Sequence, residues 1–434
     1  MPLVTMSLPV NVFMTALVAK AYPMPKVMIG LISAMPFVGN FLQIFVATFL
    51  VRWKPPKTVT VMAAWCHLAS WVALGCMLPW IPQDNLQLAG QIFLIWFLVS
   101  SCFAAVAGVS WNAWVQEWVP GRLRGKYFGR RNGMLQISTL TFMLLAGWLL
   151  ARSNYAIIAF QLIVAGAVFM RTFSLRWQWR IPARPLKHAS VPQLPLREQL
   201  KVVLRSRSLL VFISFGAVWS FAANCFGPFY HIFMLEQLEF TAFDLGVFLM
   251  LSQLGGALSL PAWGRLLDRF GNKSVMTFSL ILWQSQYLAW CFIVPENKTW
   301  LYAMWTWAGM SSAGFVLGQF TILLKLIPIQ AKSLAIGINL AATSFVAAIA
   351  PIIGGWILTR ALSQVVDPLS AYHWCFLVQP VMALLGCILL LRVHEPQASP
   401  LTMVFGAMRN IRTLSGVLGL DFLVNYVFYK PARR

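Results

Sequence analysis

Residues 263–274 read WGRLLDRFGNKS, a short polar stretch that separates two long apolar runs. It holds four charged residues and two glycines. The apolar run on each side is about 20 residues long, which is the length of helix that spans ~30 Å of hydrocarbon. The stretch is therefore predicted to be a loop at a membrane surface, between two membrane-spanning helices.

The composition of the whole chain supports this placement. Apolar residues make up 59% of the chain and charged residues 10%, whereas soluble domains average roughly 25% charged. The 33 Lys and Arg against 11 Asp and Glu give a net charge of +22, which in a soluble chain would suggest nucleic acid. In a membrane protein, basic loop residues instead fix the orientation. The sequence predicts an integral membrane protein with no nucleic-acid partner.

A window of about 20 residues predicts twelve spanning helices, so the expected fold class is an all-α membrane protein. The predicted spans are 3–21, 27–51, 58–80, 88–116, 132–151, 155–176, 209–235, 243–263, 275–294, 300–326, 334–361 and 371–391. They form two six-helix bundles joined by a linker and followed by a tail. The predicted domains are 1–176 (first bundle), 177–208 (linker), 209–391 (second bundle) and 392–434 (tail).

The basic residues give the predicted orientation. All but five of the 33 lie in alternate loops with their flanking span ends, in the linker or in the tail, and the exceptions are Lys20, Lys26, Arg152, Lys298 and Arg360. Basic loops stay cytoplasmic, so we expect a multi-pass protein of the inner (plasma) membrane with both termini inside. The segment 197–207 alternates Leu and Val with Arg and Lys and is predicted to lie as an amphipathic helix on the anionic inner leaflet. The stretch SPLTMVFGAMRNIRT (399–413) is predicted to be a similar element.

The seven cysteines all fall within predicted spans and form no CxxC pair. They are interpreted as small apolar core residues, so neither disulfides nor a metal site nor a cofactor is predicted.

An internal repeat indicates that the two bundles are related. Aligning EWVPGRLRGKYFG (117–129) with KLIPIQAKSLAIG (325–337) matches three pairs at one spacing: Pro120 with Pro328, Arg124 with Lys332, and Gly129 with Gly337. Each segment follows the fourth span of its bundle, which favours a duplication.

The opening loop resembles a known family signature. It matches the G-x-L-x-D-R-x-G-x-K loop of the major facilitator superfamily of secondary transporters at Gly264, Leu266, Asp268, Arg269, Gly271 and Lys273. The stretch VPGRLRGKYFGRRN (119–132) is similar to the corresponding loop of bacterial members. The resemblance implies two pseudo-symmetric bundles and a permease that moves a small organic solute by alternating access.

The resemblance also implies a conformational latch at the inner surface. Gly264 is expected to allow close helix approach and Gly271 a tight turn. Asp268 near a helix C-terminus needs compensation by Arg269, Lys273 or a neighbouring helix N-terminus.

The first bundle departs from the signature, because Val51 stands where the acid would fall. Its latch is expected to use Arg52 and Glu117, with Arg124 as the alternative partner of Glu117.

A substrate site is expected near the midplane, on spans 1, 4, 7 and 10. Span 7 is the richest in polar groups and has Gly227 and Pro228 as a break point. The candidate residues are Asn11, Trp111, Asn112, Ser220, Asn224, Tyr230, His231, Ser311 and Ser312. Asn224 is equally consistent with an interhelical hydrogen bond, and the tryptophans with packing.

The predicted spans contain no deeply placed Asp or Glu. Coupling, if any, would use His231, a substrate charge or a cation site of backbone and hydroxyl oxygens. Enzyme motifs such as GxxxxGK[ST], HExxH and GxSxG are absent from the sequence, so no enzyme activity is predicted, and a monomer is expected. The alternative is a non-transporting receptor or assembly scaffold, supported by the degenerate first-bundle loop and by the tail segment LGLDFLVNYVFY (418–429).

Overall fold

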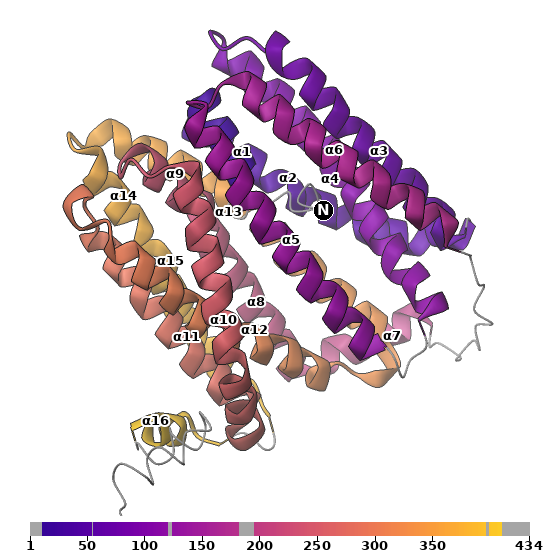
Figure 1. The fold of residues 1–434 in the computed structure, drawn as a ribbon. Coiled ribbons are helices and arrows are strands. Elements are labelled where there is room, and N and C mark those ends of the chain that lie inside the picture. Colours follow the sequence, from indigo (N-terminus) through magenta and orange to yellow (C-terminus); the bar gives the residue numbers. More distant parts are fainter. Residues whose placement is uncertain (1–10, 54, 120–123, 182–194, 396–398, 410–434) are drawn as a thin grey trace, which may run out of the picture. The chain divides into compact units, whose positions relative to one another are not determined.

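The computed structural model describes residues 11–53, 55–119, 124–181, 195–395 and 399–409. Every regular element in this part of the chain is a helix, and it contains no strand (Figure 1). The all-α prediction is confirmed. Helices suit the predicted bilayer because they satisfy every backbone hydrogen bond within the segment.

The first half of the chain supplies six helices and one π-helical turn. They are α1 (Val12–Ala16) with the turn Leu17–Ala21, α2 (Lys26–Trp53), α3 (Pro56–Met77), α4 (Leu86–Trp118), α5 (Arg124–Arg152) and α6 (Ile157–Arg180). Helix α3 packs against both α4 and α6. Aromatic contacts join them, with the Trp71 and Trp96 ring centroids 4.9 Å apart.

The second half of the chain supplies the remaining helices. They are α7 (Leu196–Arg205), α8 (Arg207–Cys225), α9 (Gly227–Glu236), α10 (Ala242–Phe270), α11 (Asn272–Leu288), α12 (Trp300–Leu326), α13 (Lys332–Gln364), α14 (Pro368–Phe376), α15 (Val378–Leu391) and α16 (Leu401–Arg409). Helix α11 packs against α12, α15 and α16.

Nine helices among the described residues are long and apolar enough to cross a membrane, and two shorter apolar helices, Val12–Ala21 and Lys26–Phe41, accompany them. The nine correspond to predicted spans 3–8 and 10–12. Predicted span 9 is shorter than expected, because α11 ends at Leu288 and a 3-10 turn follows over Ala289–Phe292. The helical membrane architecture is thus confirmed, while the count of twelve remains a prediction.

The described chain divides into two compact units. The first combines 1–193, 220–249 and 337–375, and the second combines 194–219, 250–336 and 376–434. The core of the second unit contains Phe212, Phe215, Met276 and Phe315.

Several local predictions are confirmed. Span 7 breaks at Phe226, between α8 and α9, where Pro228 cannot donate a helical hydrogen bond. The linker segment forms α7, and the tail segment forms α16. The duplication of the loops after spans 4 and 10 remains a prediction. The tail segment 418–429 lies outside the described residues.

Candidate functional site

Asn224, predicted on span 7, uses its side-chain amide within its own helix. The Asn224 side-chain amide donates to the Ser220 carbonyl oxygen at 2.8 Å, one turn earlier. Tyr230 and His231 follow in α9 and are 4% and 3% exposed. Their role as substrate ligands remains a prediction.

Asn11 on span 1 has a structural role. Its Oδ1 accepts from the Met14 N–H at 3.4 Å and so caps α1, and the residue is 2% exposed.

The serines predicted on span 10 also bond within their own helix. Ser311 donates to the Trp307 carbonyl oxygen at 2.7 Å, and Ser312 donates to the Gly309 carbonyl oxygen at 3.2 Å. Both belong to the second unit, whereas Asn224 belongs to the first. Whether the serines share a site with Asn224 remains a prediction.

Of the candidates on span 4, Trp111 lines a cavity and Asn112 is exposed. The cavity measures about 280 Å³ and lies among α3, α4, α5 and α6. The Arg131 guanidinium stands over the Trp111 ring, 3.9 Å from its centroid.

The two glycine predictions for the latch loop have different outcomes. Gly271 adopts φ 87° and begins α11, which confirms the tight turn. The close approach expected at Gly264 is wrong for the second unit, because a Cβ added there would meet no heavy atom of that unit within 4 Å. Close approach occurs earlier in α10, where a Cβ on Gly255 would lie 2.6 Å from the Thr306 carbonyl oxygen.

Asp268 and Arg269 of the latch loop are exposed. Asp268 forms no ion pair among the described residues, and Arg269 lies over the Phe270 ring at 5.3 Å. The side chains of Arg52, Glu117 and Arg124 lie outside the described residues. The latch role of these residues remains a prediction.

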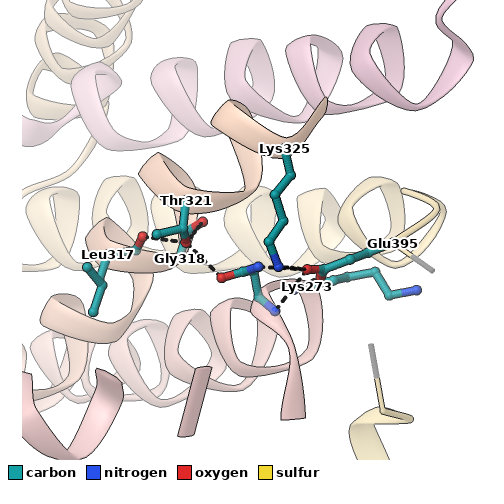
Figure 2. A network of polar contacts seen from close by, with 7 residues as sticks. Lys273, Leu317, Gly318, Thr321, Lys325 and Glu395 are labelled. Atoms are coloured by element: carbon teal, nitrogen blue, oxygen red, sulfur yellow. Dashed lines mark hydrogen bonds and ion pairs between the residues drawn. The ribbon is translucent and has the colours of Figure 1, made fainter. Parts of the chain in front are cut away.

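A carboxylate that the sequence interpretation missed holds the loop in place. Glu395 is 8% exposed and accepts from the Asn272 side-chain amide at 2.6 Å and from the Lys273 backbone N–H at 2.8 Å (Figure 2). Lys325 of α12 donates to the same carboxylate at 3.0 Å, and Thr321 donates to the Asn272 Oδ1 at 2.7 Å. An anion at the first turn of α11 complements the helix dipole. We call Glu395, Asn272, Lys273 and Lys325 the brace.

Hydrogen bonds set the charge state of Glu395. Burial by itself raises the pKa of this carboxyl. The bonds from Lys273, Asn272 and Lys325 outweigh it and hold the pKa below its ordinary value.

Glycines join the first half of the chain to the second within the first unit. A Cβ on Gly147 of α5 would lie 2.5 Å from the Ala242 carbonyl oxygen of α10, and one on Gly355 of α13 would lie 2.6 Å from the Lys26 carbonyl oxygen. Gly30 of α2 is similarly close to the Pro351 backbone of α13. We call Gly30, Gly147 and Gly355 the glycine seam. Such contacts bring helix backbones together without side-chain interlocking.

An ion pair lies at the same end of these helices. Lys26 Nζ, at the start of α2, is 2.5 Å from Glu236 Oε2 at the end of α9, and the two side chains are 15% and 25% exposed. Tyr372 of α14 donates to the same carboxylate at 3.2 Å. We call Lys26 and Glu236 the gate pair. The sequence offered one signal for it: Glu236 is an acid at the end of a span that lacks others.

A family model described as the Major Facilitator Superfamily matches residues 3–224 and 218–429. Among solved structures, the chain is similar to the inward-open xylose transporter XylE from E. coli, with 12% identity and a TM-score of 0.66, over 93% of this chain and 97% of that one. It is also similar to the nucleoside transporter NupG, with 12% identity and a TM-score of 0.62, over 90% of this chain and 98% of that one. At this identity the likeness concerns the fold.

Curated relatives match shorter segments. The niacin transporter NiaP of Acinetobacter baylyi is 26% identical over 183 residues, which are 42% of this chain and 39% of that protein. The MFS-type transporter pigP of Monascus ruber is 26% identical over 191 residues, which are 44% of this chain and 30% of that protein. The chain thus spans less than two fifths of the length of these relatives. The family model covers nearly the whole chain and agrees with the helical architecture and the solved structures, so the chain belongs to the major facilitator superfamily.

Proposed function

We propose that this chain is a secondary active transporter that moves a small organic solute across the inner membrane by alternating access. The observation that carries the proposal is the junction between the two halves of the chain. It consists of the glycine seam and the gate pair, which are non-covalent contacts that can open and close. Alternating access requires such a junction, because the two halves must part at that end to admit the solute and then close again.

The relatives support transport without fixing the substrate. Their names refer to niacin, xylose and nucleosides, which are chemically different small molecules. The proposal therefore extends to a small organic solute in general.

The orientation and the lipid contacts are part of the proposal. Leu196, Leu200 and Leu204 are spaced by one turn along α7 and are 70%, 41% and 58% exposed. Together with Arg197 and Lys201 on the same helix, this apolar row supports contact with an anionic inner leaflet. Cytoplasmic termini and a monomeric state complete the proposal.

Transport can be tested by holding the gate shut. Solutes that raise the melting temperature of the purified protein would be identified first. Lys26→Cys and Glu236→Cys would then be combined in a background without the seven native cysteines, and joined with a cleavable bifunctional maleimide in proteoliposomes. We expect uptake of the stabilising solute to stop on cross-linking and to return on cleavage. The single-cysteine variants, treated in the same way, are the matched controls.

Two results would contradict the proposal. Uptake at the full rate while the cross-link is intact would show that this end need not open. A solute that binds and stabilises the protein but is never taken up would favour the receptor alternative.

A further inference from the structure

The cavity in the first half of the chain has an unusual lining for a membrane protein. Its polar and aromatic residues come from four helices: Thr60 and His67 of α3, Trp111 and Trp114 of α4, Tyr127 and Arg131 of α5, and Arg171 and Gln178 of α6. These helices belong to one compact unit. The cavity lining contains two arginines and, among the described residues, no carboxylate.

The position of Arg171 makes it costly. It lies nine residues before Arg180, the last residue of α6, so it is about 13 Å from that helix end. It also lies inside the predicted span 155–176, where a cation is expensive unless it faces a partner or a functional cavity. Among the described residues, neither Arg171 nor Arg131 forms an ion pair with a carboxylate. Positive charge is therefore concentrated here without a described counter-charge.

Donors in the cavity lack acceptors. The Trp114 indole N–H is buried, with the residue 1% exposed, and has no hydrogen-bond partner among the described residues. The buried Nε–H of Arg171 has none either. His67 Nε2 accepts from the Trp71 indole at 3.2 Å, so its neutral ring carries its proton on Nδ1 and offers another donor. Buried donors are normally satisfied, so this lining suits a ligand rich in acceptors.

Aromatic surface accompanies the charge. The Trp111 ring has Arg131 over its face at 3.9 Å and Phe128 at its edge, with ring centroids 6.2 Å apart. An arginine held over an aromatic ring is kept in place while its remaining N–H groups can bind an anion. The cavity volume of about 280 Å³ lies just below the range of roughly 300–1,000 Å³ for drug-sized ligands. The cavity therefore fits a molecule about the size of one aromatic ring.

We infer that this cavity binds a small organic anion, a monocarboxylate with a flat apolar body, whose carboxylate is held by Arg171 and Arg131 and whose body lies against the tryptophans. The inference rests on the proposed transport function and names the substrate class. A site within one half of the chain is loaded without help from the other half. The gate pair then controls only access to it.

Equilibrium binding of radiolabelled benzoate to the purified full chain tests the inference. Benzamide has nearly the same shape but no charge, and it is the matched competitor. We expect benzamide to compete about 10- to 100-fold more weakly than unlabelled benzoate, since the arginines make charge-assisted bonds only to the carboxylate. Arg171→Gln and Arg131→Gln should each weaken benzoate binding by a similar factor. Arg176→Gln is the control, because Arg176 is an exposed arginine of the same helix outside this cavity.

The outcomes separate the site from transport. Absence of benzoate binding, equal competition by benzamide, or equal loss in Arg176→Gln would overturn the inference, while uptake of another solute would leave the transport proposal intact. Binding with the expected arginine dependence, but without benzoate uptake, would support the site and count against transport of this class. If Arg171→Gln does not fold, Arg131→Gln and the benzamide comparison still decide.

Discussion

The gate pair and the brace each centre on one carboxylate, half-buried in Glu236 and buried in Glu395. They connect different parts of the chain. Glu236 connects the second half of the chain to Lys26 of the first half. Glu395 connects the start of α11 to α12 and to the chain after α15, all within the second half. Alternating access requires contacts between halves to break and allows contacts within a half to persist. The proposed function therefore makes the gate pair a moving contact and the brace a fixed one.

This difference changes the interpretation of the loop WGRLLDRFGNKS. Its charges Asp268 and Arg269 are exposed, and their role in a latch remains a prediction. The shape of the loop depends on Gly271 and on the buried acid Glu395, which lies over 120 residues away in the sequence. A signature loop can thus combine a rigid base with exposed charges.

The largest expected effect is the loss of the brace. Glu395→Ala removes the acceptor of four donor groups on three residues, Asn272, Lys273 and Lys325, and leaves buried groups unsatisfied. We expect unfolding free energy to fall by about 2 to 4 kcal/mol. Thermal unfolding followed with a thiol-reactive dye would measure it, because Cys225, Cys375 and Cys387 are buried in the folded protein.

Two variants are controls for this prediction. Asp268→Asn, in the same loop but exposed, should change stability by less than about 0.5 kcal/mol. Lys325→Met should cost less than Glu395→Ala, because the Lys325 side chain is 57% exposed. Equal losses in Asp268→Asn and Glu395→Ala would remove the distinction between rigid base and exposed charge.

A smaller effect is expected at the glycine seam. Gly147→Val would push against the backbone of Ala242 and should destabilise the closed seam by about 1 to 3 kcal/mol. Gly166→Val is the matched control, because a Cβ on Gly166 of α6 would meet no heavy atom within 4 Å. Melting temperatures of the two variants give the comparison. Equal losses of melting temperature in Gly147→Val and Gly166→Val would show that the seam does not depend on glycine.

The smallest expected effect is a dependence on pH. Because the folded-state pKa of Glu395 lies below its unfolded value, near 4.3, its contribution to stability is present above that value. The contribution is lost as pH falls through the folded pKa. The wild type should therefore lose more stability than Glu395→Gln between about pH 6 and pH 3.5. Parallel pH profiles would mean that the charge of Glu395 does not stabilise the fold.

Sequence patterns predicted features that depend on local or periodic information. Apolar length predicted the helices, Gly227 and Pro228 predicted the break in span 7, and Leu and Arg alternation predicted α7. The duplication at a spacing of 208 residues remains a prediction. These features need no knowledge of tertiary contacts.

Pairings across the chain could not be predicted in this way. Lys26 and Glu236 are 210 residues apart, and Asn272 and Glu395 are 123 apart. Arg171 was visible as a cation inside predicted span 155–176, but its meaning depends on a cavity formed by four helices. Asn224 was selected for its polarity, whereas its amide bonds to the Ser220 carbonyl of its own helix. Periodicity does not show which partner a polar group will find.

The central claim is that the gate pair opens and closes while the second half stays braced. It is tested most directly by electron-paramagnetic-resonance distances between spin labels at Gln83 and Glu239, two exposed loop residues at the gate end of the two halves, in a background without native cysteines. We predict two distance populations in the wild type. Lys26→Met should raise the ratio of the longer-distance population to the shorter-distance population by about 5- to 30-fold, which corresponds to about one or two kcal/mol. A single distance that Lys26→Met leaves unchanged would contradict the claim.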